Sequence, residues 1–353
     1  MELQKNINDN MENLLEYIKN QNLKIVKKNN LILVKYYYGE FIDEKWKKYC
    51  KGCVLDENNF KIVCLPPIKS DVYDKEHEYT GSFIVQKLID GTMVNMFYYN
   101  EKWNLSSRSD IGGKNRWNGH TLEYLFKQCC DYNRLTESLN KEYSYSFVLQ
   151  HKLIRNISSI DENNITLVDK FNLNTLKSEK ITDDLCVNTI DSLNYDSDDI
   201  HLIVDKFKHQ NSNIKGITFK FDDGARVNYI NEKFLEIKDI NVNTQNLLYK
   251  FIELKKKNTL EKYLENYKEH QELFNKYSDK YQQMIDECVT NYHDLFIHKN
   301  IKIDKVPYQL KPIMFLINKI YINTKKYMSK TNITQLIDNL DTRRLVFIMK
   351  YYI

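Results

Sequence analysis

Residues 82–108 constrain the fold of this chain more than any other stretch. An apolar run at 83–89 ends at Asp90-Gly91, and a second run at 93–99 follows it. Runs of this length, rich in β-branched and aromatic residues and separated by turn residues, are typical of β-strands. A third strand is expected to end at Ser106-Ser107-Arg108. The sequence therefore predicts a sheet-forming core in which an aspartate, a glycine and an arginine stand at strand ends.

Similar patterns on both sides of this stretch predict further strands. Two hairpins are expected, one at 49–69 with its turn at 56–59 and one at 213–230 with its turn at 222–224. Single strands are expected at 23–26, 31–38, 143–150 and 165–168, and short helices at 10–20 and 121–132. Residues 172–200 are rich in Asp, Asn, Ser and Thr. We predict a helix plus surface loops for that region.

The pattern changes near Asn243. Beyond it, apolar side chains recur every three or four positions, as in Phe274, Tyr277, Tyr281 and Met284. This is the period of an amphipathic helix. We therefore predict three parts: an N-terminal helix in residues 1–21, an α+β domain at 22–240 and an all-α domain at 243–353.

Composition bounds the function only loosely. The formal net charge of the 353 residues is +4, so a polyanionic partner would need a local basic patch. Seven cysteines, without the spacing of a disulfide framework, suggest a reducing compartment. Cys50 and Cys53 lack the two further ligands of a zinc site, so we expect reduced thiols and no metal centre. No run reaches the length of a signal peptide or a membrane span, and we expect a soluble, intracellular protein.

The order strand, Asp90-Gly91, strand, Ser107-Arg108 resembles the nucleotide-binding core of the covalent nucleotidyltransferases. These are the ATP-dependent DNA ligases, the RNA ligases and the mRNA capping enzymes. Ordered fragments between residues 25 and 235 resemble the phage-type RNA ligase family, and look most like RNA-ligase-like proteins of large DNA viruses that infect eukaryotes. The resemblance implies an ATP-grasp-like antiparallel-sheet core. The helical C-terminal region departs from the DNA ligases and capping enzymes, which carry a β-barrel there.

The chain departs from the family at the residue that carries the chemistry. The family reads Lys-x-Asp-Gly, and its lysine attacks the α-phosphate of the nucleotide. Here Leu88 holds that position and Lys87 stands one residue earlier. Because side chains alternate across a strand, Lys87 is expected to point to the opposite face. A β-bulge at Leu88-Ile89 would restore its direction.

Other family positions are changed as well. Gln150 stands where the family has a glutamate, and Lys215 replaces a glutamate that lies near the catalytic metal. Arg226-Val-Asn228 keeps only the first cation of a Lys-x-Lys motif, and Lys220 is a candidate substitute. Lys51-Gly52 and Lys69 match an Arg-Gly pair and a lysine of the family hairpin. A basic loop at 109–118, with Gly112-Gly113, is expected to cradle a phosphate.

The resemblance implies roles for specific residues. Nucleotide-binding residues would be Gly91, Arg108, Gln150, Lys215, Lys220 and Arg226, and catalytic residues would be Asp90 and, with a bulge, Lys87. We expect Asp90, Gly91, Arg108, Gln150, Lys215 and Arg226 to converge on one positively charged cleft. No metal site is expected, because two motif carboxylates are replaced.

Three functional hypotheses remain open. The leading one is a degenerate nucleotidyltransferase, a pseudoenzyme that binds RNA or nucleotide without forming lysyl-AMP. The second is an active ATP-dependent RNA ligase that uses Lys87, ATP and Mg²⁺. The third is a structural or virion interaction protein. For a viral protein, we expect the host cytoplasm or the virion as the location.

Overall fold

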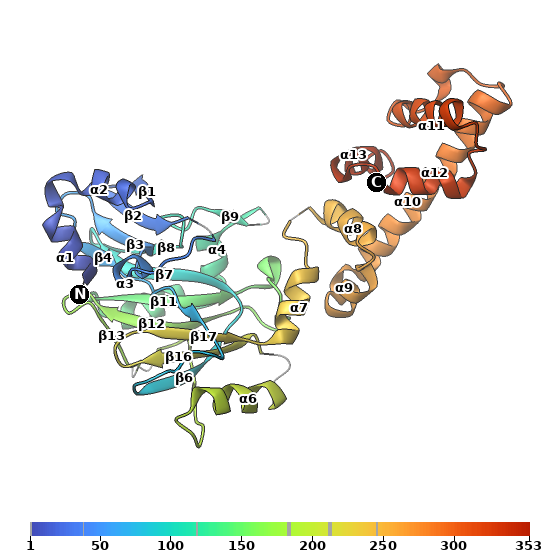
Figure 1. Cartoon of the computed structure of the whole chain (residues 1–353). Helices are drawn as coiled ribbons and strands as arrows, with labels where there is room; N and C mark the ends of the chain where they lie inside the picture. The colour runs from blue at the N-terminus through green and yellow to red at the C-terminus, as the bar shows by residue number, and fades with distance from the viewer. Residues whose placement is uncertain (1, 38, 118, 182–184, 211–213, 245) are drawn as a thin grey trace. The chain divides into compact units, whose positions relative to one another are not determined.

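The computed structural model describes residues 2–37, 39–117, 119–181, 185–210, 214–244 and 246–353. It divides into two compact units, Met1–Leu235 and Glu236–Ile353 (Figure 1). The first unit mixes helices with mainly antiparallel sheets, and the second is helical. The expected α+β class with a helical C-terminal region is confirmed. Tyr38, Asn118 and Asn213, which fall within expected elements, lie outside the described residues.

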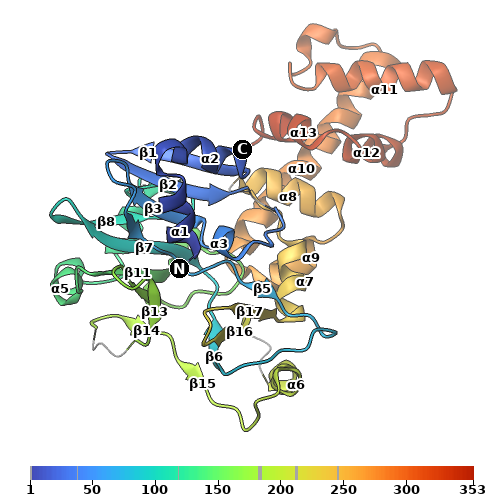
Figure 2. The same ribbon diagram turned by 60° about the vertical axis from the view of Figure 1, so that its left-hand side comes forward.

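The first sheet is antiparallel and follows chain order. Its strands are β1 (Leu23–Lys28), β2 (Leu31–Tyr36), β3 (Lys51–Asp56) and β4 (Ile62–Cys64). Figure 2 shows α1 (Glu2–Asp9) and α2 (Leu14–Asn20) beside it. Leu3, Ile7, Leu14 and Ile18 of these helices join the same hydrophobic core as the sheet. The sequence predicted one helix in residues 1–21, with its amphipathic part at 10–20, whereas the structure has two helices, of which α1 buries only Leu3 and Ile7.

The central sheet has six strands. The order is β13 (Lys177–Glu179), β12 (Asn164–Asn172), β11 (Tyr143–Gln150), β7 (Thr92–Tyr99) and β8 (Lys102–Ser106), and β14 (Asn188–Thr189) pairs with β12. Helices α4 (Leu122–Lys127) and α5 (Tyr132–Ser138) pack against its apolar side chains. The hydroxyl of Thr121 accepts the backbone N–H of Tyr124, which fixes the start of α4.

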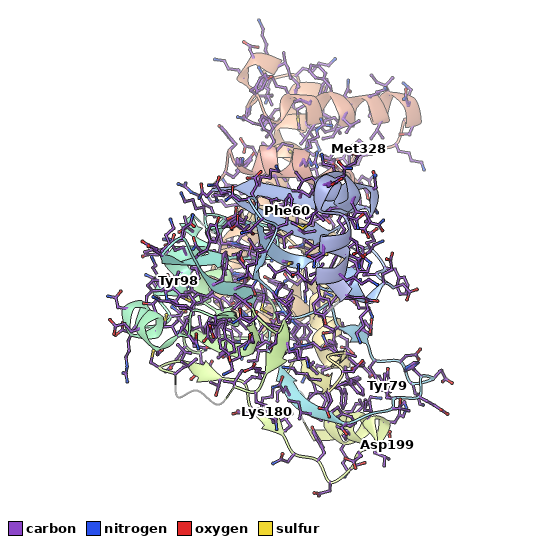
Figure 3. All side chains as sticks on the ribbon, turned by 90° about the vertical axis from the view of Figure 1, so that its left-hand side faces the viewer. Phe60, Tyr79, Tyr98, Lys180, Asp199 and Met328 are labelled. Carbon is purple, nitrogen blue, oxygen red and sulfur yellow. The ribbon has the colours of Figure 1, made fainter. Side chains whose placement is uncertain are left out.

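The third sheet contains five strands. Their order is β15 (Ser192–Leu193), β6 (Phe83–Leu88), β16 (Gly216–Phe221), β17 (Arg226–Ile230) and β5 (Asp71–Val72). Helix α6 (Ile200–Gln210) covers one face through Ile203, Val204 and Phe207 (Figure 1). Tyr79 lies near the start of α6, beside Asp199 in Figure 3, with its ring 5.9 Å from that of His201. A short pair, β9 (Arg116–Trp117) and β10 (His120–Thr121), stands apart from the three sheets.

The predicted hairpins are confirmed, since β3 pairs with β4 and β16 pairs with β17. The two strands that flank Asp90-Gly91 do not pair with each other as a hairpin. Strand β6 lies in the five-stranded sheet and β7 in the six-stranded sheet. The helix predicted within residues 172–200 is wrong. The described part of that region holds β13, β14 and β15, and α6 begins only at Ile200. Strands of two or three residues have no periodic pattern, and they form here by pairing with β12 and β6.

The second unit packs its helices around one hydrophobic core. They are α8 (Leu247–Lys256), α9 (Leu260–Asn266), α10 (Gln271–Tyr292), α11 (Lys311–Thr324), α12 (Lys330–Asp338) and α13 (Thr342–Met349), and α7 (Glu232–Ile240) crosses the boundary between the units. Asp341 caps α13 by accepting the N–H groups of Arg343 and Arg344. Residues 236–244 and 246–353 contain no strand. No helix in the described chain is long and apolar enough to cross a membrane.

Candidate functional site

Asp90 is a buried carboxylate whose two oxygens both have partners. Oδ2 accepts the backbone N–H groups of Ile157 and Ser158, each at 2.9 Å. Oδ1 lies 3.5 Å from Nζ of Lys215, at the start of β16. Arg155 braces the same loop by donating to the carbonyl oxygens of Ile157 and Ser158. Asp90 therefore orders the loop after β11 and neutralises Lys215.

Gly91 permits the close crossing from β6 to β7. A Cβ atom at this position would lie 2.6 Å from the carbonyl oxygen of Leu149 and 2.5 Å from Cγ1 of Val148, both on β11. Gln150 supports the crossing, because its side-chain amide donates to the carbonyl oxygen of Asp90 at 3.0 Å. The structure thus brings Asp90, Gly91, Gln150 and Lys215 together. The amide N–H of Gln150 positions the backbone of Asp90 at this crossing.

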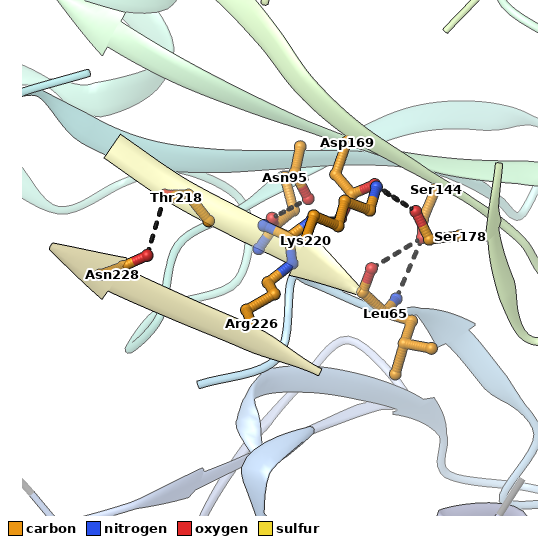
Figure 4. A network of polar contacts seen from close by, with 10 residues as sticks. Leu65, Asn95, Ser144, Asp169, Ser178, Thr218, Lys220, Arg226 and Asn228 are labelled. Carbon is orange, nitrogen blue, oxygen red and sulfur yellow. Dashed lines mark hydrogen bonds and ion pairs between the residues drawn. The ribbon is translucent and has the colours of Figure 1, made fainter. Parts of the chain in front are cut away.

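Asp169 on β12 is fully buried and holds two cations (Figure 4). Nζ of Lys220 donates to its Oδ1 at 2.9 Å, and Arg226 pairs with its Oδ2. The hydroxyl of Ser178 donates to the same carboxylate at 2.5 Å. Burial lowers the pKa of Lys220, and Asp169 opposes that effect. One carboxylate thus faces two cations, which leaves local positive charge uncompensated.

Asn95 lies beside this network in Figure 4. Its Oδ1 accepts the hydroxyl of Ser146 at 2.8 Å, while its buried Nδ2 has no acceptor among the described residues. Asn228, in the position of the second family cation, accepts the hydroxyl of Thr218 at 2.8 Å. The region around Lys220 and Arg226 therefore offers more donors than acceptors.

Lys51, the first residue of β3, is the centre of the cationic cluster. Its Nζ has no hydrogen-bond acceptor and no ion-pair partner within the described chain. Burial lowers the pKa of Lys51 to about 8, and the charges of four further cations add to the effect. Those cations are Arg226, Arg108, Lys215 and Lys69. These four cations come from separate strand ends, so residues far apart in the sequence lie close to the amine of Lys51.

Tyr36 at the end of β2 orders two of these cations. The guanidinium of Arg108 lies 4.6 Å from the centre of its ring, and Nζ of Lys69 lies 5.2 Å from it. Such cation–π contacts are most favourable where water is excluded, and Tyr36 is buried. Gly52 adopts a φ of +105°, and a Cβ there would lie 2.9 Å from Cα of Arg108. Lys51-Gly52 and Arg108 are thereby locked together.

A cavity of about 250 Å³ opens beside Lys51 and Arg108. Its wall is otherwise largely apolar, with Met93, Trp117 and Leu122. The remaining lining residues are Pro66, Pro67, Thr92, Ser107, Ser109 and Asn115. Ligand sites commonly combine such an apolar wall with a few polar groups. The cavity can take a flat apolar group with an anion at the cationic side.

The basic loop at 109–118 contributes less than expected. Ser109, Asn115 and Trp117 line the cavity, but Lys114 and Arg116 are exposed and do not. The N–H of Gly112 donates to the carbonyl oxygen of Leu105 at 2.6 Å. That amide is already used within the fold, so the glycine pair does not present both N–H groups to a phosphate.

Lys87 lies on the other face of its strand. β6 pairs with β16 without a register shift through Leu88, and Lys87 stands opposite Ile217, which is buried under α6. Leu88 stands opposite Gly216, on the face that carries Lys220. Nζ of Lys87 lies 3.7 Å from Asp191. The bulge that would re-aim Lys87 is therefore not present in the described strand pair.

The donor set near Lys51 does not fit a divalent metal. Mg²⁺ needs several oxygen ligands, including carboxylates, but Asp90 and Asp169 are both tied to cations. The described residues contain no cluster of three or more His, Cys, Asp or Glu side chains that could hold a metal ion. Burial also raises the pKa of Cys50 to about 12, so this thiol stays protonated.

Sequence reasoning missed the importance of two residues of this site. In the sequence Lys51 stands out only as a match to the Arg-Gly pair, and the absence of an acceptor around it among the described residues cannot be read from sequence. The sequence does not mark Asp169 as a site residue, because a single aspartate in a strand usually faces solvent and here belongs to no motif.

Comparisons with known proteins give distant similarities. No protein-family model matches the chain, and no curated protein sequence matches it. A protein assigned as an ATP-dependent DNA ligase from Aquifex aeolicus is 15% identical over 67% of this chain, with a TM-score of 0.42. An RNA ligase of Naegleria gruberi with pyrophosphate is 13% identical over 44% of this chain, with a TM-score of 0.35. A variant of that ligase with ATP and Mn has a TM-score of 0.36 at the same identity.

The matched regions span 66% of the DNA ligase chain and 50% of the RNA ligase chain. The solved structures named above are ligases at low identity to this chain. Similarities of this size assign neither family nor activity.

Proposed function

We propose that the first unit is a ligase-like nucleotidyltransferase domain that binds a phosphate-bearing ligand, a nucleotide or an RNA, without forming a lysyl-nucleotide. The observation that carries this proposal is the lysine at the centre of the cationic cluster. Nζ of Lys51 has no acceptor within the described chain and lies among Arg108, Lys215, Arg226 and Lys69.

Charge balance supports an anionic ligand. The cluster contains Lys51, Lys69, Arg108, Lys215, Lys220 and Arg226. Asp90 pairs with Lys215, and Asp169 pairs with Lys220 and Arg226, whereas Lys51 and Lys69 form no ion pair with a described residue. Buried charge without a counter-charge is costly. A phosphate group that enters the cavity supplies this counter-charge and accepts hydrogen bonds from Lys51. Phosphates are the anions for which arginine and lysine clusters are best suited.

The cavity wall supports a ligand with a flat apolar part. The indole of Trp117, with Met93 and Leu122 nearby, offers the kind of surface on which a nucleobase packs. Lys51 and Arg108 line the same cavity, and they would hold the phosphates of that ligand.

Two observations argue against nucleotidyl transfer. The amine that stands nearest to the family position, Lys87, lies on the face of β6 that α6 covers, and Leu88 has no nucleophilic group. Attack on an α-phosphate also needs neutralisation of the leaving pyrophosphate, which the family supplies with a divalent metal. The carboxylates here are paired with cations instead. Binding without turnover is the function that these residues favour.

Calorimetry with ATP and with a 5′-phosphorylated oligoribonucleotide tests the proposal, in the presence of a chelator and then of Mg²⁺. Lys51→Met should lower the affinity at least tenfold, because it removes a charge-assisted contact. Lys114→Met is the matched control, since Lys114 is exposed and does not line the cavity. Binding should not require Mg²⁺.

Incubation with α-labelled ATP and Mg²⁺ separates the proposal from the enzyme hypothesis. A covalent label that is stable to alkali and labile in acid, as a lysyl phosphoramidate is, and that Lys87→Arg removes would show that the chain performs adenylyl transfer. A protein that binds neither ATP nor RNA would favour the structural or virion interaction hypothesis.

A further inference from the structure

The second unit carries an exposed surface on and beside α11 that combines aromatic and basic side chains. We define the α11 surface by Tyr308, Phe315, Lys319, Ile322, Lys325, Lys326 and Tyr327. Every one of these side chains is exposed. The exposed fractions are 75% for Tyr308, 63% for Tyr327 and 56% for Phe315. Large aromatic side chains that remain in water at this level, several on one segment, mark an interaction site.

The net positive charge of the chain is concentrated in the segment that contains the α11 surface, residues 297–327. Residues 297–327 contain seven lysines and one aspartate, a formal net charge of +6 with histidines neutral. The whole chain carries +4, so the other residues together carry −2. None of these seven lysines forms an ion pair with a described residue. Residues 297–327, which include the α11 surface, are thus strongly basic in a chain that is otherwise almost neutral.

The geometry of α11 separates this surface from the core. Ile313, Met314 and Ile317 are buried in the hydrophobic core of the second unit. Phe315, Lys319 and Ile322 follow at spacings of four and three, so they form one stripe on the opposite side of the helix. Tyr308 precedes α11 and Tyr327 follows it, with the Tyr327 ring stacked 6.3 Å from that of His293. Aromatic rings therefore stand just before, in the first half of and just after a helix about 21 Å long.

We propose that the α11 surface binds single-stranded nucleic acid. Unpaired bases stack on exposed aromatic rings, and lysines between the rings neutralise the phosphates that connect those bases. Rings and lysines along α11 and at its two ends suit the bases and the phosphates of a single strand. A duplex offers no unstacked base for these rings, and an apolar protein partner would leave the lysines without counter-charge. This site uses none of the residues around Lys51, so it stands independently of the function proposed for the first unit.

Fluorescence anisotropy on the full chain tests the proposal with a labelled oligouridylate of about twelve nucleotides, its deoxy counterpart and a duplex of equal length. Both single strands should bind more tightly than the duplex, with an affinity that falls as salt rises. The double variant Phe315→Ala/Tyr327→Ala should bind about tenfold or more weakly. Lys319→Gln/Lys326→Gln should make the salt dependence shallower, by about 0.7 in logarithmic slope for each phosphate that the variant no longer neutralises.

Two controls decide where the strand binds. Phe347→Ala removes an exposed ring on α13, outside the α11 surface, and should leave the affinity unchanged. Lys114→Met removes an exposed lysine of the first unit that does not line the cavity, and it should also leave the affinity unchanged. An affinity that both double variants preserve would overturn the proposal, as would a preference for the duplex or no single-strand binding at about 0.1 M salt. Tighter binding of the ribo strand would assign RNA as the ligand, and equal binding would assign single strands of either kind.

Discussion

The ammonium group of Lys215 lies 3.5 Å from Oδ1 of Asp90, next to Gly91, whose missing Cβ permits the close crossing from β6 to β7. This pair decides the electrostatics of the site. A carboxylate at position 215, as the RNA ligases have, would put two negative charges together and favour a metal ion. A lysine at 215 compensates the charge of Asp90, so Asp90 does not neutralise Lys51.

Lys215→Glu should therefore weaken the binding of ATP in chelator by at least tenfold. The variant removes a cation near Lys51 and creates a carboxylate pair that repels phosphate. It should not create adenylyl transfer, because Leu88 is unchanged. Calorimetry measures the affinity, and Lys233→Glu, an equal charge change at an exposed residue of α7, is the control. Unchanged affinity in Lys215→Glu would remove Lys215 from the site.

Binding should depend on pH through Lys51. Its pKa lies at about 8, so the amine is mostly charged at pH 7 and mostly neutral at pH 9. The affinity for ATP should fall over this range, because the neutral amine gives up its charge-assisted hydrogen bond. Lys51→Arg remains charged at both pH values, and its affinity should vary much less. A wild-type profile that matches the Lys51→Arg profile would contradict the role of Lys51.

The charged amine of Lys51 should lower the free energy of unfolding when no ligand is bound. The folded-state pKa of Lys51 is lower than its unfolded value, so the unfolded chain binds the proton more tightly. The cost is full below pH 8 and disappears as pH rises from about 8 to about 10.5. Lys51→Met should thus raise the free energy of unfolding at pH 7, by up to about 3 kcal/mol, while it weakens binding. Urea denaturation measures this difference, and a destabilised variant would show that Lys51 is structural.

Much of the first unit follows from local patterns. The hairpin of β16 and β17 has a clear turn at 222–224, and a periodic run predicts β11. The pairing of β6 with β16 is different, because it joins residues far apart in the chain and depends on which faces become buried. The environment of Lys51 depends in turn on that pairing, since Lys215 and Arg226 arrive with β16 and β17. The sequence could therefore predict the strand ends and show that the lysine stands at position 87 and not at position 88. It could not predict that the other cations of the cluster surround the amine of Lys51.

Asp169 illustrates the same limit and gives a further prediction. Asp169→Asn should destabilise the first unit by about 3–5 kcal/mol, because Lys220 and Arg226 would keep their buried charges without a carboxylate. Asp71→Asn removes an exposed ion pair with Lys48 and should cost less than about 1 kcal/mol. Urea denaturation compares the two variants. Equal effects would mean that the buried network contributes no more than a surface pair.

The decisive measurement is a structure of the chain with ATP bound in the presence of a chelator. A phosphate oxygen should lie within about 3.2 Å of Nζ of Lys51, with the guanidinium of Arg108 on the same phosphates and the base against Trp117. Lys87 should make no contact with the nucleotide. A nucleotide bound elsewhere, or a covalent bond between a lysine and the α-phosphorus, would contradict the proposed function.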